Sequence, residues 1–141
     1  MISNLNKSNP LQLKPMNIMK RLFLLVVLVV SLSIRLLAQS ISYVETTRSW
    51  HYIYDEKGRK IHTVSTSQGT IPAYGSSFYI LQSGSFLKTF DPKGRRLATL
   101  SISGAGQVVG ASGDTFTTKL GGWLYTWSKE GKKLSVRWVQ R

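Results

Sequence analysis

The segment WHYIYDEKGRKI at residues 50–61 returns as FLKTFDPKGRRL at 86–97 and as WLYTWSKEGKKL at 123–134. The turn glycines of the three copies, Gly58, Gly94 and Gly131, are 36 and then 37 residues apart. A fixed period of this length is typical of repeated structural units, each of which buries its apolar face on its neighbours. The three copies therefore predict three units of the same kind.

Each copy has the pattern of a β-hairpin. In the first copy, Trp50, Tyr52 and Tyr54 alternate with His51 and Ile53, so that the aromatic side chains share one face of an extended strand. A basic turn around the glycine then leads into a second strand. Aromatic and β-branched residues dominate these segments, and no helical period appears after residue 40. The sequence therefore predicts an all-β fold.

Further extended segments surround each hairpin and complete the predicted unit. One precedes the hairpin at 42–46, 78–82 and 115–119, and an inner strand is expected at 71–74 and 108–111. We expect three repeats, at about 41–66, 67–103 and 104–138, of a mainly four-stranded antiparallel sheet. The total is about eleven strands, because no inner strand is predicted for the first unit. A one-residue insertion between Leu97 and Gly106 accounts for the longer second interval.

The repeated unit resembles a four-stranded β-propeller blade, in which aromatic strands precede a D-x-x-G-[KR] hairpin. This resemblance covers residues 41–138 and implies an open partial propeller, with a three-sided prism as the other arrangement of three sheets. The segment YIYDEKGR at 52–59 is also similar to the YD repeat of Rhs-type shell proteins. That family has a shorter period, and the other two copies lack the Tyr-Asp pair, so neither resemblance assigns binding residues.

The N-terminal part has the layout of a secretory signal peptide, 1–38, with cleavage after Ala38. The basic segment MKR at 19–21 precedes an apolar run at 22–34. Residues 1–18 precede Met19, which is a second possible start of translation. Arg35 is unusual so late in an apolar run, which leaves an uncleaved anchor as the alternative. The run has 13 residues, fewer than the roughly 20 that a spanning helix needs. We expect export to the periplasm or the cell exterior.

Basic side chains are concentrated at the hairpin turns. Residues 39–141 contain 14 basic and 6 acidic residues, a net charge of +8. Clustered cations attract polyanions such as lipopolysaccharide phosphates, acidic glycans or anionic lipids. Lysines at strand ends are also ordinary turn residues that prevent edge-to-edge aggregation. The candidate polyanion-binding residues are Lys57, Arg59, Lys60, Lys93, Arg95, Arg96, Lys129, Lys132 and Lys133.

The aromatic residues of the hairpins provide a second candidate site. Trp50, Tyr52, Trp123 and Tyr125 could stack on sugar rings, although aromatic residues at this spacing more often form the core between sheets.

The sequence contains no recognisable catalytic, cofactor or metal site. Cysteine is absent, and His51 and His62 have no evident third metal ligand. No G-x-S-x-G elbow occurs, and no predicted helix follows the glycines of GAGQVVG at 104–110, as a dinucleotide-binding loop requires. These observations do not favour an enzyme.

These expectations combine into a binding or interaction module without a catalytic role. The alternative is a structural or assembly protein that completes its sheets by homo-oligomerisation, because unpaired strand edges favour association.

Overall fold

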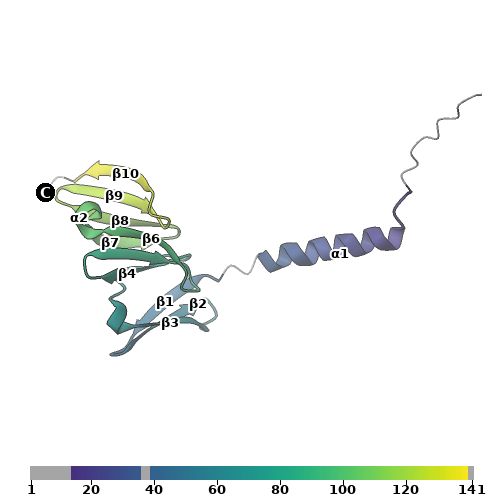
Figure 1. Cartoon of the computed structure of the whole chain (residues 1–141), viewed down its shortest axis with the longest axis horizontal. Helices are drawn as coiled ribbons and strands as arrows, with labels where there is room; N and C mark the ends of the chain where they lie inside the picture. The colour runs from purple at the N-terminus through teal and green to yellow at the C-terminus, as the bar shows by residue number, and fades with distance from the viewer. Residues whose placement is uncertain (1–13, 36–38, 140–141) are drawn as a thin grey trace, which may run out of the picture. The chain divides into compact units, whose positions relative to one another are not determined.

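The computed structural model describes residues 14–35 and 39–139 (Figure 1). The chain divides into two compact units, residues 1–38 and 39–141, and each is described by itself. The first unit contains helix α1 (Ile18–Arg35). No helix in the described part of the chain has the length and apolar character needed to cross a membrane. The predicted cleavage after Ala38 falls outside the described residues.

The second unit consists of three antiparallel sheets, and each sheet is built from strands that are consecutive in the chain. None of the sheets is closed, and the prediction of an all-β fold is confirmed. The first sheet contains β1 (Ile41–Thr46), β2 (Trp50–Asp55) and β3 (Lys60–Ser65). The middle sheet contains β4 (Tyr79–Ser83), β5 (Phe86–Phe90) and β6 (Arg96–Ser101). The third sheet contains β7 (Gln107–Ser112), β8 (Thr115–Leu120), β9 (Trp123–Ser128) and β10 (Lys133–Trp138).

The expectation of eleven strands is wrong by one. The described residues form ten strands, and only the third sheet has four. The segment expected as the inner strand of the middle unit instead contacts β4 through two isolated bridges, Thr70 with Gln82 and Tyr74 with Tyr79. Pro72 lies between these bridges and has no backbone N–H to donate, so a continuous ladder cannot form there.

Two short helical turns link the sheets, although no helix was expected after residue 40. Helix η1 (Thr66–Gln68) follows β3, and helix α2 (Ile102–Ala105) follows β6. A single turn is too short to show a helical period in the sequence. Because α2 is one residue longer than η1, it accounts for the insertion that the repeat alignment requires.

Glycine ends both helical turns for two reasons. Gly69 and Gly106 have φ angles of 145° and 92°, which side chains other than glycine rarely adopt. A Cβ atom would also lie 2.1 Å from the carbonyl oxygen of Gln82 at the first position, and 2.4 Å from that of Lys119 at the second. The backbone of β4 therefore approaches Gly69 directly, and the backbone of β8 approaches Gly106 directly.

The middle sheet contributes to an apolar cluster on each of its two faces, and the alternation of side chains around β4 shows this most clearly. Phe78 and Ile80 belong to one apolar cluster, whereas Tyr79 and Leu81 belong to a second. The second cluster also includes Ile41, Ile53 and Val64 of the first sheet. The first cluster is completed by Leu87, Ala105, Phe116 and Trp127, which connect the middle and third sheets.

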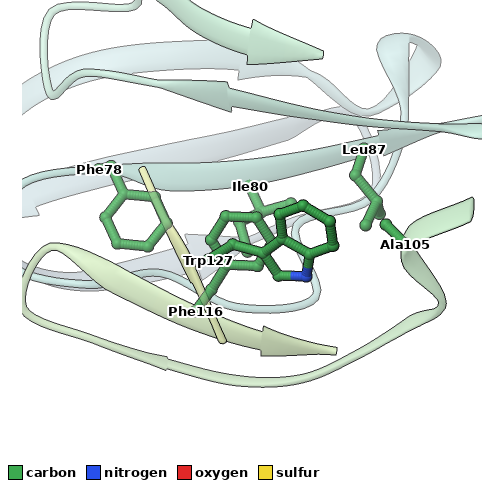
Figure 2. Packing of buried hydrophobic residues seen from close by; sticks show 6 residues of the cluster. All are labelled: Phe78, Ile80, Leu87, Ala105, Phe116 and Trp127. Carbon is green, nitrogen blue, oxygen red and sulfur yellow. The ribbon is translucent and has the colours of Figure 1, made fainter. Parts of the chain in front are cut away.

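A buried chain of hydrogen bonds fixes the core between the middle and third sheets. Trp127 donates from its indole Nε1 to the hydroxyl of Thr118 over 2.9 Å, and Thr118 donates to the carbonyl oxygen of Ala105. Figure 2 shows the indole of Trp127 among Phe116, Ile80 and the other residues of this cluster. The chain of bonds satisfies polar groups of β8, β9 and α2 that are removed from water.

Replacing Thr118 with valine tests the importance of this chain. T118V keeps the volume of the side chain but leaves the Trp127 indole without its acceptor, so we expect a loss of about 1–3 kcal/mol in the free energy of unfolding. Urea unfolding of the full chain measures this loss.

T117V is the matched control, because Thr117 has its side chain on the opposite face of β8 and forms no side-chain hydrogen bond in the described structure. We expect T117V to change stability by no more than about 0.5 kcal/mol. Equal effects of the two substitutions would contradict the structural role of the buried chain.

Candidate functional site

The basic hairpin turns are organised by the residue that precedes each of them. In the first turn, Oδ1 of Asp55 accepts hydrogen bonds from the backbone N–H groups of Lys57 and Arg59, both over 2.9 Å. Its Oδ2 atom accepts a hydrogen bond from Nε of Arg59 over 2.8 Å. The backbone hydrogen bond from Arg59 is the main reason why the pKa of Asp55 is lowered, with smaller contributions from its side chain and from Lys57.

The second turn repeats this geometry and the third retains part of it. Asp91 accepts bonds from the backbone N–H of Lys93 and from the backbone and side chain of Arg95. Burial opposes ionisation of Asp91, but the bonds from Arg95 outweigh it and lower its pKa. Ser128 replaces the carboxylate in the third turn, where its hydroxyl accepts a bond from the N–H of Lys132 over 3.2 Å.

The three turns form one row, as contacts between neighbouring sheets show. A Cβ atom on Gly94 of the second turn would lie 2.3 Å from Nε2 of His62 in the first sheet. A Cβ atom on Gly131 of the third turn would lie 2.9 Å from Cβ of Ala98, which occupies the position of His62 in the middle sheet. The second and third turns therefore each abut the same position, His62 or Ala98, of the preceding sheet.

Acidic residues reduce the charge of this row. Arg59 and Arg95 pair with the aspartates of their own turns, and Lys129 pairs with Asp114 over 3.0 Å. Glu56 and Glu130 also lie in the turn segments. Nine basic and five acidic side chains thus leave the row a net charge of +4. The four basic residues that form neither an ion pair nor a contact with an aromatic ring in the described structure are Lys57, Lys93, Arg96 and Lys132.

An aromatic surface covers the outer face of the first sheet. Tyr43 of β1 lies opposite Tyr54 of β2, and their rings stack with centroids 4.5 Å apart. Trp50 and Tyr52 follow on the same face of β2. The hydroxyl of Tyr54 donates a hydrogen bond to Glu45 over 3.0 Å, which raises the pKa of this tyrosine.

The other two sheets contain the same cross-strand pair in a covered position. Tyr79 lies opposite Phe90 in the middle sheet, and Phe116 lies opposite Trp127 in the third. Tyr79 and Phe116 are each 1% exposed, because the preceding sheet packs over them, whereas Tyr43 is 43% exposed. The first sheet is therefore the one in which the described residues leave this equivalent position uncovered.

The four residues predicted to stack on sugars are divided between two sheets. Trp50 and Tyr52 lie together on the outer face of the first sheet, and Trp50 is 45% exposed. Trp123 contacts Trp138 edge to face on the third sheet, and Tyr125 packs against the core shared with the middle sheet. Tyr43 is not among the residues predicted to stack on sugars, although its alignment with Tyr79 and Phe116 was the signal that could have identified it.

The two histidines have structural environments. His51 is buried, and its Nε2 atom donates to the carbonyl oxygen of Gly69 over 2.8 Å. Its Nδ1 atom is 2.8 Å from the hydroxyl of Thr46, so both ring nitrogens are used. His62 lies beside the Tyr79 ring, with centroids 6.4 Å apart. His51 therefore ties β2 to the loop after η1.

The described residues contain no group of three histidine, cysteine or acidic side chains placed to hold a metal ion.

No protein-family model matches the chain, and no curated protein matches it. The candidate sites are therefore the row of basic turns and the aromatic face of the first sheet, argued from their own geometry.

The turn aspartates predict a specific dependence of stability on pH. In the folded chain the pKa of Asp55 and that of Asp91 are lowered, so their contribution is complete above about pH 5 and is lost as the pH falls through the lowered pKa values. We expect the double variant D55N/D91N to have a lower urea midpoint than the wild type at pH 7, and this deficit to become smaller as the pH is lowered to about 2.

E130Q provides the control, because it removes a turn carboxylate that makes no hydrogen bond in the described structure. The urea midpoint of E130Q should equal that of the wild type at pH 7 and at about pH 2. A deficit of the double variant that is the same at pH 7 and pH 2 would show that the carboxylate charge has no role in these turns.

Proposed function

We propose that this chain is an exported, non-catalytic binding module that uses the outer face of its first sheet to bind a glycan. The proposal depends mainly on one observation. Tyr43, which stacks on Tyr54, is exposed, whereas its equivalents Tyr79 and Phe116 in the other two sheets are buried under the preceding sheet. Exposed aromatic faces with polar surroundings mark interaction sites more often than ordinary surface.

The chemistry of this face supports a glycan as the ligand. Its rings are those of tyrosine and tryptophan, which combine a flat apolar surface with a hydrogen-bonding group. Glu45 lies at the Tyr54 hydroxyl, and the Nζ atom of Lys60 lies 4.4 Å from the centroid of the Tyr52 ring. Sugar rings present apolar C–H faces and peripheral hydroxyls, so rings with adjacent charged and hydroxyl groups are complementary to them.

The row of basic turns supports polyanion binding less strongly. Its net charge of +4 is less than its nine basic residues suggest, because Asp55, Asp91 and Asp114 neutralise part of it. Charge alone contributes attraction without selectivity.

The packing also supports the arrangement of the sheets as successive blades. A prism would direct one face of each sheet toward a common centre, whereas the middle sheet here has a separate apolar cluster on each face. We therefore propose an open, propeller-like stack of three repeats, preceded by a signal peptide that ends at Ala38.

Oligosaccharide titration followed by tryptophan fluorescence tests the glycan proposal. The probes are cellohexaose and chitohexaose, with a heparin hexasaccharide as the polyanion. We expect a saturable fluorescence change with one of the neutral hexasaccharides, because Trp50 lies on the proposed binding face. Isothermal titration calorimetry of Y43A and Y52A should show binding at least about tenfold weaker, which corresponds to about 1.4 kcal/mol.

W138A is the matched control, because Trp138 is an exposed aromatic residue of the third sheet. W138A should bind the neutral hexasaccharide with the affinity of the wild type. Failure of both neutral probes to bind would overturn the glycan proposal. Binding of heparin alone, abolished by about 0.2 M salt, would favour the row of basic turns instead.

Self-association through the same face is the second candidate function. The outer face of the third sheet is polar: Thr115 and Thr117 occupy the positions that Phe78 and Ile80 have in the middle sheet. A polar outer face is typical of a capping unit. A second copy would therefore pack its first sheet on the first sheet of its partner, in a two-fold dimer.

Sedimentation equilibrium at micromolar concentration distinguishes this candidate from the first. A dimer that becomes monomeric in Y43A, and remains dimeric in W138A, is the expected result for self-association. A monomer at all concentrations would exclude it and leave the face free for a different ligand.

A further inference from the structure

A groove lies on the face of the middle sheet that packs against the first sheet, and its smaller end reaches β3 of the first sheet. It consists of two adjoining hollows of about 440 Å³ and about 240 Å³. Gln68, Leu81, Phe90 and Gly94 line both hollows. The groove thus has an apolar floor from β4 and β5, with the η1 turn and the second hairpin turn among its walls.

The polar lining of the groove is basic or neutral. Lys88 and Arg96 line the larger hollow, and His62 lines the smaller one. No acidic residue is among the residues that line either hollow. Within the described structure neither Lys88 nor Arg96 forms an ion pair, and the aspartate of the adjoining turn, Asp91, is already bonded to Arg95.

This pair of basic residues departs from the repeat. In the first sheet, Lys60 lies over the ring of Tyr52, and in the third sheet Lys133 lies over the ring of Tyr125, 4.9 Å from its centroid. Arg96 and Lys88 occupy the same two positions in the middle sheet. The middle sheet therefore has two cations where both other sheets have a cation above an aromatic ring.

The presence of Lys88 beside Arg96, where the other two sheets have a tyrosine, lowers the stability of the fold, and a bound anion would offset this loss. Two like charges on neighbouring strands repel, and the apolar floor formed by Leu81 and Phe90 weakens the screening of that repulsion. Replacing the aromatic residue with Lys88 also removes the cation–π attraction found in the other sheets. An anion between the two side chains would convert the repulsion into two charge-assisted hydrogen-bonding interactions.

We propose that this groove is an oxyanion-binding site, in which Lys88 and Arg96 hold a carboxylate, sulfate or phosphate group above Leu81 and Phe90. The planar guanidinium of Arg96 suits the paired oxygens of such a group, and Lys88 adds a point charge. The larger hollow has the volume of a small-molecule site. The site does not depend on the aromatic face of the first sheet, because none of Tyr43, Trp50 and Tyr52 lines it.

Isothermal titration calorimetry of the full chain at low ionic strength tests this site. The probes are inorganic phosphate and D-glucuronate, with D-glucose as the uncharged counterpart of the latter. We expect saturable binding of at least one anion, no comparable binding of glucose, and binding at least about tenfold weaker in K88Y and in R96Q. K119Q removes one positive charge outside the groove and should bind as the wild type does.

The relative affinities identify the source of the oxyanion. Tighter binding of glucuronate would indicate an acidic sugar, and tighter binding of phosphate would indicate a free phosphate or a phosphate ester. Absence of saturable binding by both anions would overturn the proposal. So would equal binding of glucose and glucuronate, or an affinity that is unchanged in both K88Y and R96Q.

A thermal measurement keeps the test independent of folding defects. K88Y restores the tyrosine found at this position in the other two sheets, so it should melt no lower than the wild type without an anion. Phosphate should raise the melting temperature of the wild type more than that of K88Y, because the stabilisation by a ligand of the folded state grows with its affinity. If K88Y does not fold, R96Q decides the outcome by the same criteria.

Discussion

The packing of the middle sheet on both of its faces is the constraint on which the rest of the second unit depends. Successive residues from Phe78 to Leu81 point to alternate sides and contribute to two separate apolar clusters. A shift of one residue in the pairing of β4 would exchange the two sets of side chains. The flanking sheets are held in place because this strand offers an apolar surface to each of them.

This arrangement explains why equivalent residues have different environments. Tyr79 in the middle sheet and Phe116 in the third sheet are buried because a preceding sheet covers them. In the first sheet no described residue covers the equivalent Tyr43, so it remains accessible, with Glu45 hydrogen-bonded to the hydroxyl of Tyr54. Position in the stack, rather than residue type, separates a core pair from a candidate binding surface.

Departures from the repeat are as informative as its agreement. Ser128 replaces an aspartate at a turn and keeps one of the backbone hydrogen bonds, so the turn persists. Lys88 replaces an aromatic residue and places a second cation beside Arg96 in an open groove, where the structure shows no compensating carboxylate. The first substitution preserves local geometry, whereas the second changes the chemistry of a concave surface.

The sequence by itself determined the strands and turns, because alternation of side chains and turn chemistry are local. The segment 50–61 was sufficient to predict β2, its turn and β3, and the prediction of a continuous strand at 71–74 was wrong because Pro72 interrupts it. Tertiary structure alone decided which aromatic face is uncovered and that Lys88 and Arg96 share a groove. Both depend on how one sheet packs against the next, and residues far apart in the chain set that packing.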